Sequence, residues 1–204
     1  MFRRRLAVLV AAAICGSCST AVAAEGGKNV VQELVRLFSA WSGDGSDASI
    51  FKEAARYIDY NGMAASALGK AQWEKLTARQ RQQFVETFRR LVEQKYYQRW
   101  HKIFYQGKIQ YLGESTTGGE SLVKTGLTVG KEESTVYWLM HPRNGELAVI
   151  DMRVEDKDLL GRLRARFQRR LAKHGFDNLL AWMKRHADRE EDEEDSGAST
   201  ASRP

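Results

Sequence analysis

The spacing of apolar residues predicts helices in the first half of the chain. Large apolar residues recur at steps of three and four over residues 30–41 and 84–103, as on one face of an amphipathic helix. Thr77 can cap the second helix, because its hydroxyl can accept from the amide of Gln80 while the Gln80 side chain reaches back to the cap. We expect this helix to be the longest in the chain. Shorter helical pieces are expected at residues 50–57 and 63–68.

The period of the pattern changes to two after Gly107. Four short runs there are rich in β-branched and aromatic residues, which favour strands, and glycine-containing connectors separate them. Since the connectors are too short to hold crossover helices, neighbouring strands should run antiparallel. The strands are expected at residues 109–112, 122–129, 135–140 and 147–154.

Two more helices are expected after the strands. Asp158 can cap a helix that carries Leu163 and Phe167 on one face, and Gly175 ends it before a second helix starts at Phe176. Helices on both sides of a run of strands predict an α+β fold. In this fold an antiparallel sheet of about four strands has helices packed on one face.

The first two dozen residues have the order of a secretory signal peptide. Three arginines at positions 3–5 precede an apolar run over residues 6–14, and small residues end the segment at Ala23 and Ala24. The apolar run is about half the roughly 20 residues that a membrane-spanning helix needs. We therefore assign residues 1–24 to a signal peptide and expect export to the periplasm.

Both cysteines, Cys15 and Cys18, lie within this predicted signal peptide. Cleavage would leave a mature chain without disulfides, metal thiolates or a cysteine nucleophile. A second interpretation is a lipoprotein cleavage site, because Gly16 and Ser17 precede Cys18, which would then be acylated. The position three residues before Cys18 holds Cys15, where such sites need a large aliphatic residue. The sequence therefore favours the cleaved form without a lipid anchor.

The charges of the chain are unevenly distributed. The formal net charge is +6, yet seven acidic residues stand between Asp188 and Asp195. This composition is typical of a disordered acidic tail, assigned to residues 188–204. The remaining body, residues 25–187, keeps 27 basic against 19 acidic residues and suits one domain. A basic body suits nucleic acid, an anionic membrane or anionic ligands, and export argues against nucleic acid.

Two blocks of short motifs follow one another along the body. They are Leu68-Gly69, Trp73, Leu76-Thr77, Gln80-Arg81, Phe84-Val85-Glu86, Phe88, Leu91 and Tyr96, then Ile150-Asp151, Val154-Glu155, Leu159-Leu160, Arg164, Phe167, Gly175-Phe176-Asp177 and Leu179-Leu180. In order and spacing the blocks resemble the toluene-tolerance family of periplasmic phospholipid-binding proteins, the MlaC-like proteins. The resemblance covers about residues 30–185.

The resemblance implies a fold, a ligand and two partners. Members have an NTF2-like arrangement, in which a curved sheet and helices enclose an apolar pocket for phospholipid acyl chains. They pass lipid between an outer-membrane lipoprotein complex and an inner-membrane ABC transporter complex with a lipid-binding periplasmic ring. No cofactor, metal or catalytic residue is expected. Related members occur beside hopanoid biosynthesis, so a hopanoid or other lipid is the alternative ligand.

The expected pocket lies where the sheet buries a face against the long helix and the helix that follows Asp158. Period two places Val123, Leu127 and Val129 on one sheet face, and a step of four places Leu163 above Phe167. The same pattern is typical of an ordinary filled core, and only the resemblance favours a cavity. The residues expected to line the pocket are Phe84, Phe88, Leu91, Val123, Leu127, Val129, Val154, Leu160, Leu163 and Phe167.

An enzyme and a protein-binding adaptor are the alternatives from other classes. An enzyme needs a pocket group with a shifted pKa and a defined partner. The acid–base candidates are Asp151, Glu155, Asp156, Asp158, His141 and His174, and they show neither a Ser-His-Asp arrangement nor metal-ligand spacing. An adaptor would have a filled interior and an exposed apolar patch. The sequence thus favours a lipid carrier without catalytic residues.

Overall fold

The structure is a computed structural model that describes residues 23–41 and 48–188. Nearly all of the predicted signal peptide and of the predicted acidic tail lies outside these residues. Both assignments, and the boundaries of the body at residues 25 and 187, therefore stay predictions. Within the described residues no helix combines the length and apolar character that a membrane span requires.

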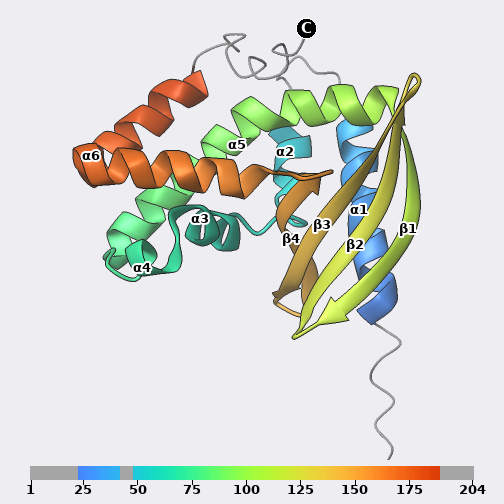
Figure 1. Ribbon diagram of the computed structural model, residues 1–204, viewed down its shortest axis with the longest axis horizontal. Coiled ribbons are helices and arrows are strands. Elements are labelled where there is room, and N and C mark those ends of the chain that lie inside the picture. Colours follow the sequence, from blue (N-terminus) through green and yellow to red (C-terminus); the bar gives the residue numbers. More distant parts are fainter. Residues whose placement is uncertain (1–22, 42–47, 189–204) are drawn as a thin grey trace, which may run out of the picture.

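Helices and strands follow one another in the predicted order, with helices on both sides of the strands (Figure 1). This order and the packing of the helices on the sheet confirm the α+β class. The elements are α1 (Ala23–Ala40), α2 (Ala48–Ala54), α3 (Tyr60–Leu68), α4 (Lys70–Trp73), α5 (Ala78–Gln106), β1 (Lys108–Thr117), β2 (Glu120–Val129), β3 (Glu132–Arg143), β4 (Glu146–Val154), β5 (Lys157–Asp158) and α6 (Leu159–Asp188).

The strands form one antiparallel sheet in the order β1-β2-β3-β4-β5. Each strand pairs with its neighbour in sequence, as the short connectors predicted. The four long strands contain the four predicted runs, and β5 adds two residues that the pattern did not reveal. The register shifts between Tyr111 and Gly113 and between Leu139 and Met140. Such irregularities bend a strand and increase its twist, which suits a sheet that curves around a helix.

Helix α5 begins at the predicted capping box. The Thr77 hydroxyl accepts from the Gln80 amide at 3.2 Å, and the Gln80 side-chain oxygen accepts from the Thr77 amide at 2.9 Å. A cap of this kind stabilises a helix by about 1 kcal/mol. Phe84, Phe88 and Leu91 lie buried on one side of the helix, as their spacing predicted.

Helix α6 contains the predicted break at Gly175. Its φ of 78° and ψ of 178° lie outside the helical region, in a conformation that favours glycine. The two halves of α6 consequently run in different directions (Figure 1). At the start of the helix the Asp158 carboxylate accepts from the Gly161 amide at 2.9 Å, so the predicted cap is present.

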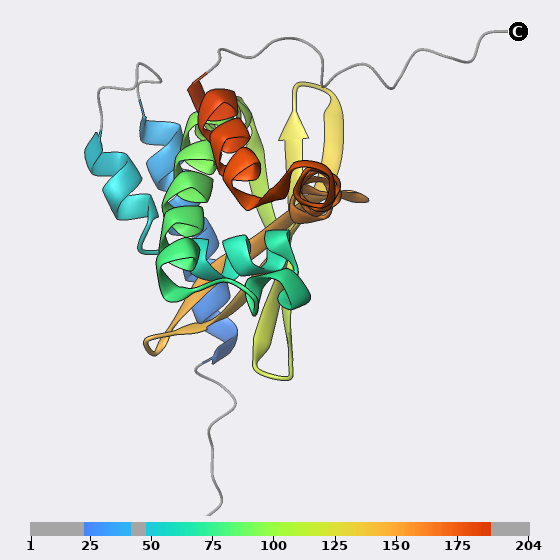
Figure 2. The same ribbon diagram turned by 90° about the vertical axis from the view of Figure 1, so that its left-hand side faces the viewer.

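The two faces of the sheet differ in polarity. Val123 and Trp138, paired across β2 and β3, are buried on the inner face. On the outer face the ring of Tyr137 lies between Lys124 and Arg153, whose cationic groups are 5.7 and 4.4 Å from its centroid. The helices lie on the inner side (Figures 1 and 2).

Helix α1 covers much of the inner face, which the sequence did not predict. It contacts β1, β2 and β4, whereas α3 and α6 reach the sheet at β4. Helix α5, expected along the sheet, touches it near its C-terminal end, where Phe104 stacks on Trp138 at 5.8 Å. Gly27 permits the close approach of α1, since a Cβ there would lie 2.6 Å from Cγ2 of Val123. The expectation was incomplete because periodicity reveals an apolar helix face but not the surface it meets.

Two carboxyl groups lie together where β4 and β5 meet α6. Asp151 accepts from the Met152 amide at 2.8 Å and interacts with the Asp158 carboxyl group. Burial first, and then the negative charge of Asp158, raise the pKa of Asp151 from 3.8 to about 7. A raised pKa means that the folded protein holds this proton more tightly than the unfolded chain. The resulting stabilisation is present below about pH 4 and is lost as the pH rises toward 7.

We predict that Asp151→Asn stabilises the protein in a pH-dependent way. Asparagine resembles the protonated acid, so the variant should melt near the wild-type temperature at pH 3.5 and several degrees above it at pH 8. The melting temperature should rise by about 2–4 °C for each kcal/mol added to the free energy of unfolding. Thermal unfolding followed by circular dichroism across this range measures the effect. Asp156→Asn, which removes an exposed carboxyl group, is the control. A melting difference for Asp151→Asn that is constant with pH would contradict the prediction.

Candidate functional site

The inner face of the sheet and helices α1, α3 and α5 enclose an apolar interior. At its centre is a void of about 10 Å³. A cavity needs at least about 10–15 Å³ and several polar partners to hold one water molecule, so this void is dry. Its lining residues come from both layers and are all apolar: Leu34, Phe38, Ile58, Met63, Trp100, Trp138, Val149 and Met152.

Aromatic rings fill most of the space around the void. Phe38 of α1 meets Tyr97 and Trp100 of α5 edge to face, at centroid distances of 4.7 and 5.4 Å. These geometries are favourable contacts beyond simple burial. The Trp138 indole on the sheet side donates to the Thr125 hydroxyl at 3.0 Å. The interior is therefore closed in this state, because ligand pockets commonly have volumes of about 300–1,000 Å³.

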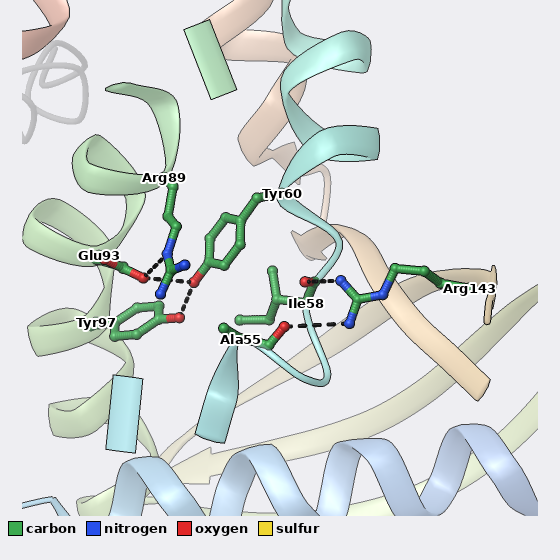
Figure 3. A network of polar contacts seen from close by, with 7 residues as sticks. All are labelled: Ala55, Ile58, Tyr60, Arg89, Glu93, Tyr97 and Arg143. Atoms are coloured by element: carbon green, nitrogen blue, oxygen red, sulfur yellow. Dashed lines mark hydrogen bonds and ion pairs between the residues drawn. The ribbon is translucent and has the colours of Figure 1, made fainter. Parts of the chain in front are cut away.

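Polar contacts fasten the segment between α2 and α3 to the end of β3. The Arg143 guanidinium donates to the carbonyl oxygens of Ile58 at 2.7 Å and Ala55 at 3.3 Å (Figure 3). Next to it, His141 Nε2 lies 2.7 Å from a carboxylate oxygen of Asp59, which is buried. These contacts close one margin of the apolar interior.

A second polar network joins α3 to α5. The Tyr60 and Tyr97 hydroxyls hydrogen bond each other, and Tyr60 also reaches Glu93, which pairs with Arg89 at 2.6 Å (Figure 3). Burial raises the pKa of both phenols, so both stay protonated and can donate. The network satisfies polar groups that would otherwise be costly to bury at this helix junction.

A groove of about 490 Å³ lies outside the interior, beside the start of α5. Arg81 lies along it, with its guanidinium 5.5 Å from the Trp73 ring and donating to the Trp73 carbonyl oxygen. The groove is open to solvent and mixes polar with apolar groups, so it shields a hydrocarbon chain poorly. Its lining residues are Asn61, Trp73, Ala78, Arg81, Gln82, Val85 and Glu86.

The ten residues expected to line a pocket fall into two groups. Phe84, Phe88 and Phe167 pack against one another between α5 and α6, with centroids 5.8–6.3 Å apart. Leu91, Leu160 and Leu163 are also buried on these two helices. The second group lies on the sheet, where Val123 and Leu127 are buried and Val129 and Val154 are half-buried.

All ten belong to or pack against the same core, yet none lines the void or the groove. Their role beside a bound ligand therefore stays a prediction. Sequence reasoning missed the residues that do line the void, such as Phe38, Met63 and Val149. The pattern marked Phe38 as apolar helix surface, but only the packing of α1 into the sheet brings it to the centre.

The acid–base candidates are dispersed. His141 pairs with Asp59, and Asp151 with Asp158, at separate places on the sheet. Glu155 accepts from the Thr135 amide in a turn, whereas Asp156 and His174 are exposed. Across residues 23–41 and 48–188 no three His, Cys, Asp or Glu side chains converge in a way that could hold a metal ion.

The fold of this chain is shared with a protein of known structure. A solved structure of a phospholipid-binding protein from Ralstonia solanacearum, in complex with a phospholipid, superposes with a TM-score of 0.68 and 14% sequence identity. The match covers 81% of this chain and 96% of the Ralstonia chain. At this low identity the match establishes a shared fold. No curated protein matches the chain by sequence.

The sequence of the described body also matches a family directly. The sequence model for "MlaC protein" matches residues 31–185, which is most of the chain and agrees with the resemblance seen in the two motif blocks. With its fold and its sequence pointing to the same family, this chain belongs to the MlaC family.

Proposed function

We propose that this protein is a periplasmic phospholipid carrier and not an enzyme. The observation that carries the proposal is its membership of the MlaC family over residues 31–185. The fold it shares with a phospholipid-bound protein from Ralstonia solanacearum supports the same conclusion. So does an interior whose central lining is entirely apolar.

The physical basis of carriage is the burial of hydrocarbon. Each acyl methylene removed from water contributes about 0.8 kcal/mol, so a carrier needs a long apolar cavity more than specific polar contacts. The interior of this chain has the right chemistry but is closed to about 10 Å³. Binding must therefore separate the sheet from the helices, and the freed space would be taken by the acyl chains.

The lining of the void suits such an opening. Met63 and Met152 are unbranched and can change shape at low cost. The backbone hydrogen bonds that join Val149 to Tyr57 and Asp59 can stay in place while the other apolar side chains separate. The Arg143 contacts and the Tyr60 network lie at the margins and can hold the layers in register while the centre widens. The phosphate head group would stay at the surface of a body with an excess of basic residues.

The proposed partners are an inner-membrane ABC transporter complex with a lipid-binding periplasmic ring and an outer-membrane lipoprotein complex. This part of the proposal rests on the family and on the predicted signal peptide. The carrier would take lipid from one complex and release it to the other. A reversible opening suits this role, because a carrier must both bind and release its ligand.

The first prediction from this proposal is that the purified full-length protein retains about one diacyl phospholipid per chain, since burial of both acyl chains makes dissociation into water slow. Native mass spectrometry gives the stoichiometry, and lipid extraction followed by mass spectrometry identifies the molecule. A hopanoid found at the same stoichiometry would keep the carrier role and change the ligand. Protein free of lipid in several independent preparations would count against carriage.

The second prediction is that Leu127→Asp abolishes lipid retention while the protein still melts cooperatively. Leu127 lies on the inner sheet face, where a charge beside acyl chains costs several kcal/mol and should lower lipid content at least about tenfold. Water entering the empty pocket would reduce this cost in the lipid-free protein. An unfolded Leu127→Asp variant would show that this position belongs to the filled core instead.

Met152→Asp tests the same wall at a half-buried position that lines the void and is better able to accept a charge. It should fold and lose its lipid. Leu147→Asp, also half-buried on β4 but not in contact with the void, is the matched control and should keep its lipid. Full lipid content in folded Met152→Asp would place the acyl chains outside this interior.

A third prediction concerns location. Cell fractionation with mass spectrometry of the intact protein should find the chain in the periplasmic extract, shortened by about 23 or 24 residues. The reason is that residues 1–24 have the order of a cleavable signal peptide. Substituting the three arginines at positions 3–5 with glutamate should trap the precursor in the cytoplasm. An uncleaved wild-type chain in the cytosol would overturn the proposed location.

A further inference from the structure

The first half of α6 carries five basic residues on one side, here called the cationic stripe: Arg162, Arg166, Arg169, Arg170 and Lys173. At about 100° per residue their positions fall within an arc of roughly 100° on the helix. The segment from residue 159 to 176 contains no aspartate or glutamate. No acid within this half of the helix can therefore neutralise the stripe.

Most of the stripe faces solvent. Leu163 and Phe167, which lie next to the stripe around the helix, are buried. Arg162, Arg169 and Lys173 are exposed, and none of them forms an ion pair with an acidic residue in the described part of the chain. The stripe thus combines three exposed cations with two, Arg166 and Arg170, that are half-buried.

Two members of the stripe contact the second half of α6. The guanidinium groups of Arg166 and Arg170 lie 5.9 and 5.0 Å from the centroid of the Trp182 ring. Trp182 in turn stacks on His186, with 4.8 Å between ring centroids. The array of cations therefore reaches within two turns of Asp188, the last residue of the helix.

The sequence that follows α6 has the opposite charge. Asp188 pairs with Arg90 of α5 at 2.6 Å, which fixes where the chain leaves the helix. Six consecutive acids then occupy residues 190–195. An extended chain covers up to about 3.3 Å per residue, so this acidic run can reach more than 20 Å from Asp188. Trp182 lies only about 9 Å back along the helix, which places Arg166 and Arg170 of the stripe within reach.

We propose that the acidic run at residues 190–195 binds the cationic stripe of its own chain. Carboxylates bound to arginine form short, charge-assisted hydrogen bonds, and the five cations face a run of six acids. The short tether gives the run an effective concentration in the millimolar range, which favours it over a free polyanion. The tail would then mask the stripe from anionic surfaces, and added salt would weaken the masking. This proposal does not depend on the lipid ligand.

A labelled synthetic peptide of residues 188–204 tests the proposal, because it must compete with the attached run for the same stripe. Its binding to the full-length protein is measured by fluorescence anisotropy at low salt. One variant neutralises the run, with glutamines for the glutamates and asparagines for the aspartates at residues 190–195. Another replaces the five residues of the stripe with glutamine. A third combines both sets.

Neutralising the run should tighten peptide binding at least about tenfold, as expected when an intramolecular competitor is removed. The gain should vanish in the combined variant and in 0.5 M salt, at which surface charges are screened over about 4–5 Å. The matched control adds Lys52→Gln, Lys75→Gln, Lys102→Gln, Lys108→Gln and Lys131→Gln to the neutralised run, removing the same charge from exposed sites elsewhere. It should keep most of the gain.

Equal peptide affinity for the wild type and the run-neutralised protein would overturn the proposal. So would a gain in affinity that survives neutralisation of the stripe, because the peptide would then bind elsewhere. Lipid content, measured in parallel, should be the same in all variants. If neither the wild type nor any variant contains lipid, that result would count against carriage and leave the masking result intact.

Discussion

The contact between α1 and the inner face of the sheet is the interaction on which the rest of the structure depends. The sheet has one polar outer face and one apolar inner face, and the apolar face must be covered. Gly27 brings α1 close to Val123, and Phe38 then meets the rings of α5. Helix α5 thereby joins the sheet layer to α3 and α6. Without α1 the inner face would be exposed to solvent and one side of the apolar interior would be open.

The same contact explains why a closed structure is compatible with carriage. Apart from the backbone hydrogen bonds of Val149 with Tyr57 and Asp59, the centre of the interior is held by apolar packing, which has no directional bonds. The margins are held by hydrogen bonds such as those of Arg143 and Tyr60. Apolar side chains pack against hydrocarbon as favourably as against one another, so acyl chains can replace contacts between side chains at little net cost in free energy. The hydrogen bonds at the margins cannot be replaced in this way, and they keep the layers aligned.

Local signals in the sequence predicted most elements but not all of their partners. The capping box at Thr77, the cap at Asp158 and the break at Gly175 were predicted because each depends on residues within one turn. The strand β5 was missed because two residues are too few to show a period. The void-lining residues Ile58 and Val149 were missed because they meet only across a long-range parallel bridge.

The sequence by itself determined the fold class, the antiparallel order of the strands and the family, since these follow from periodicity, connector length and the order of motifs. It also marked Phe84, Phe88 and Phe167 as apolar positions facing a core. Only the tertiary structure decided which helix covers the inner face of the sheet and where a void lies within the core. The physical reason is that an apolar stripe records the need for burial but not the surface that provides it. Whether such stripes meet in a packed core or border a pocket depends on how several of them fit together.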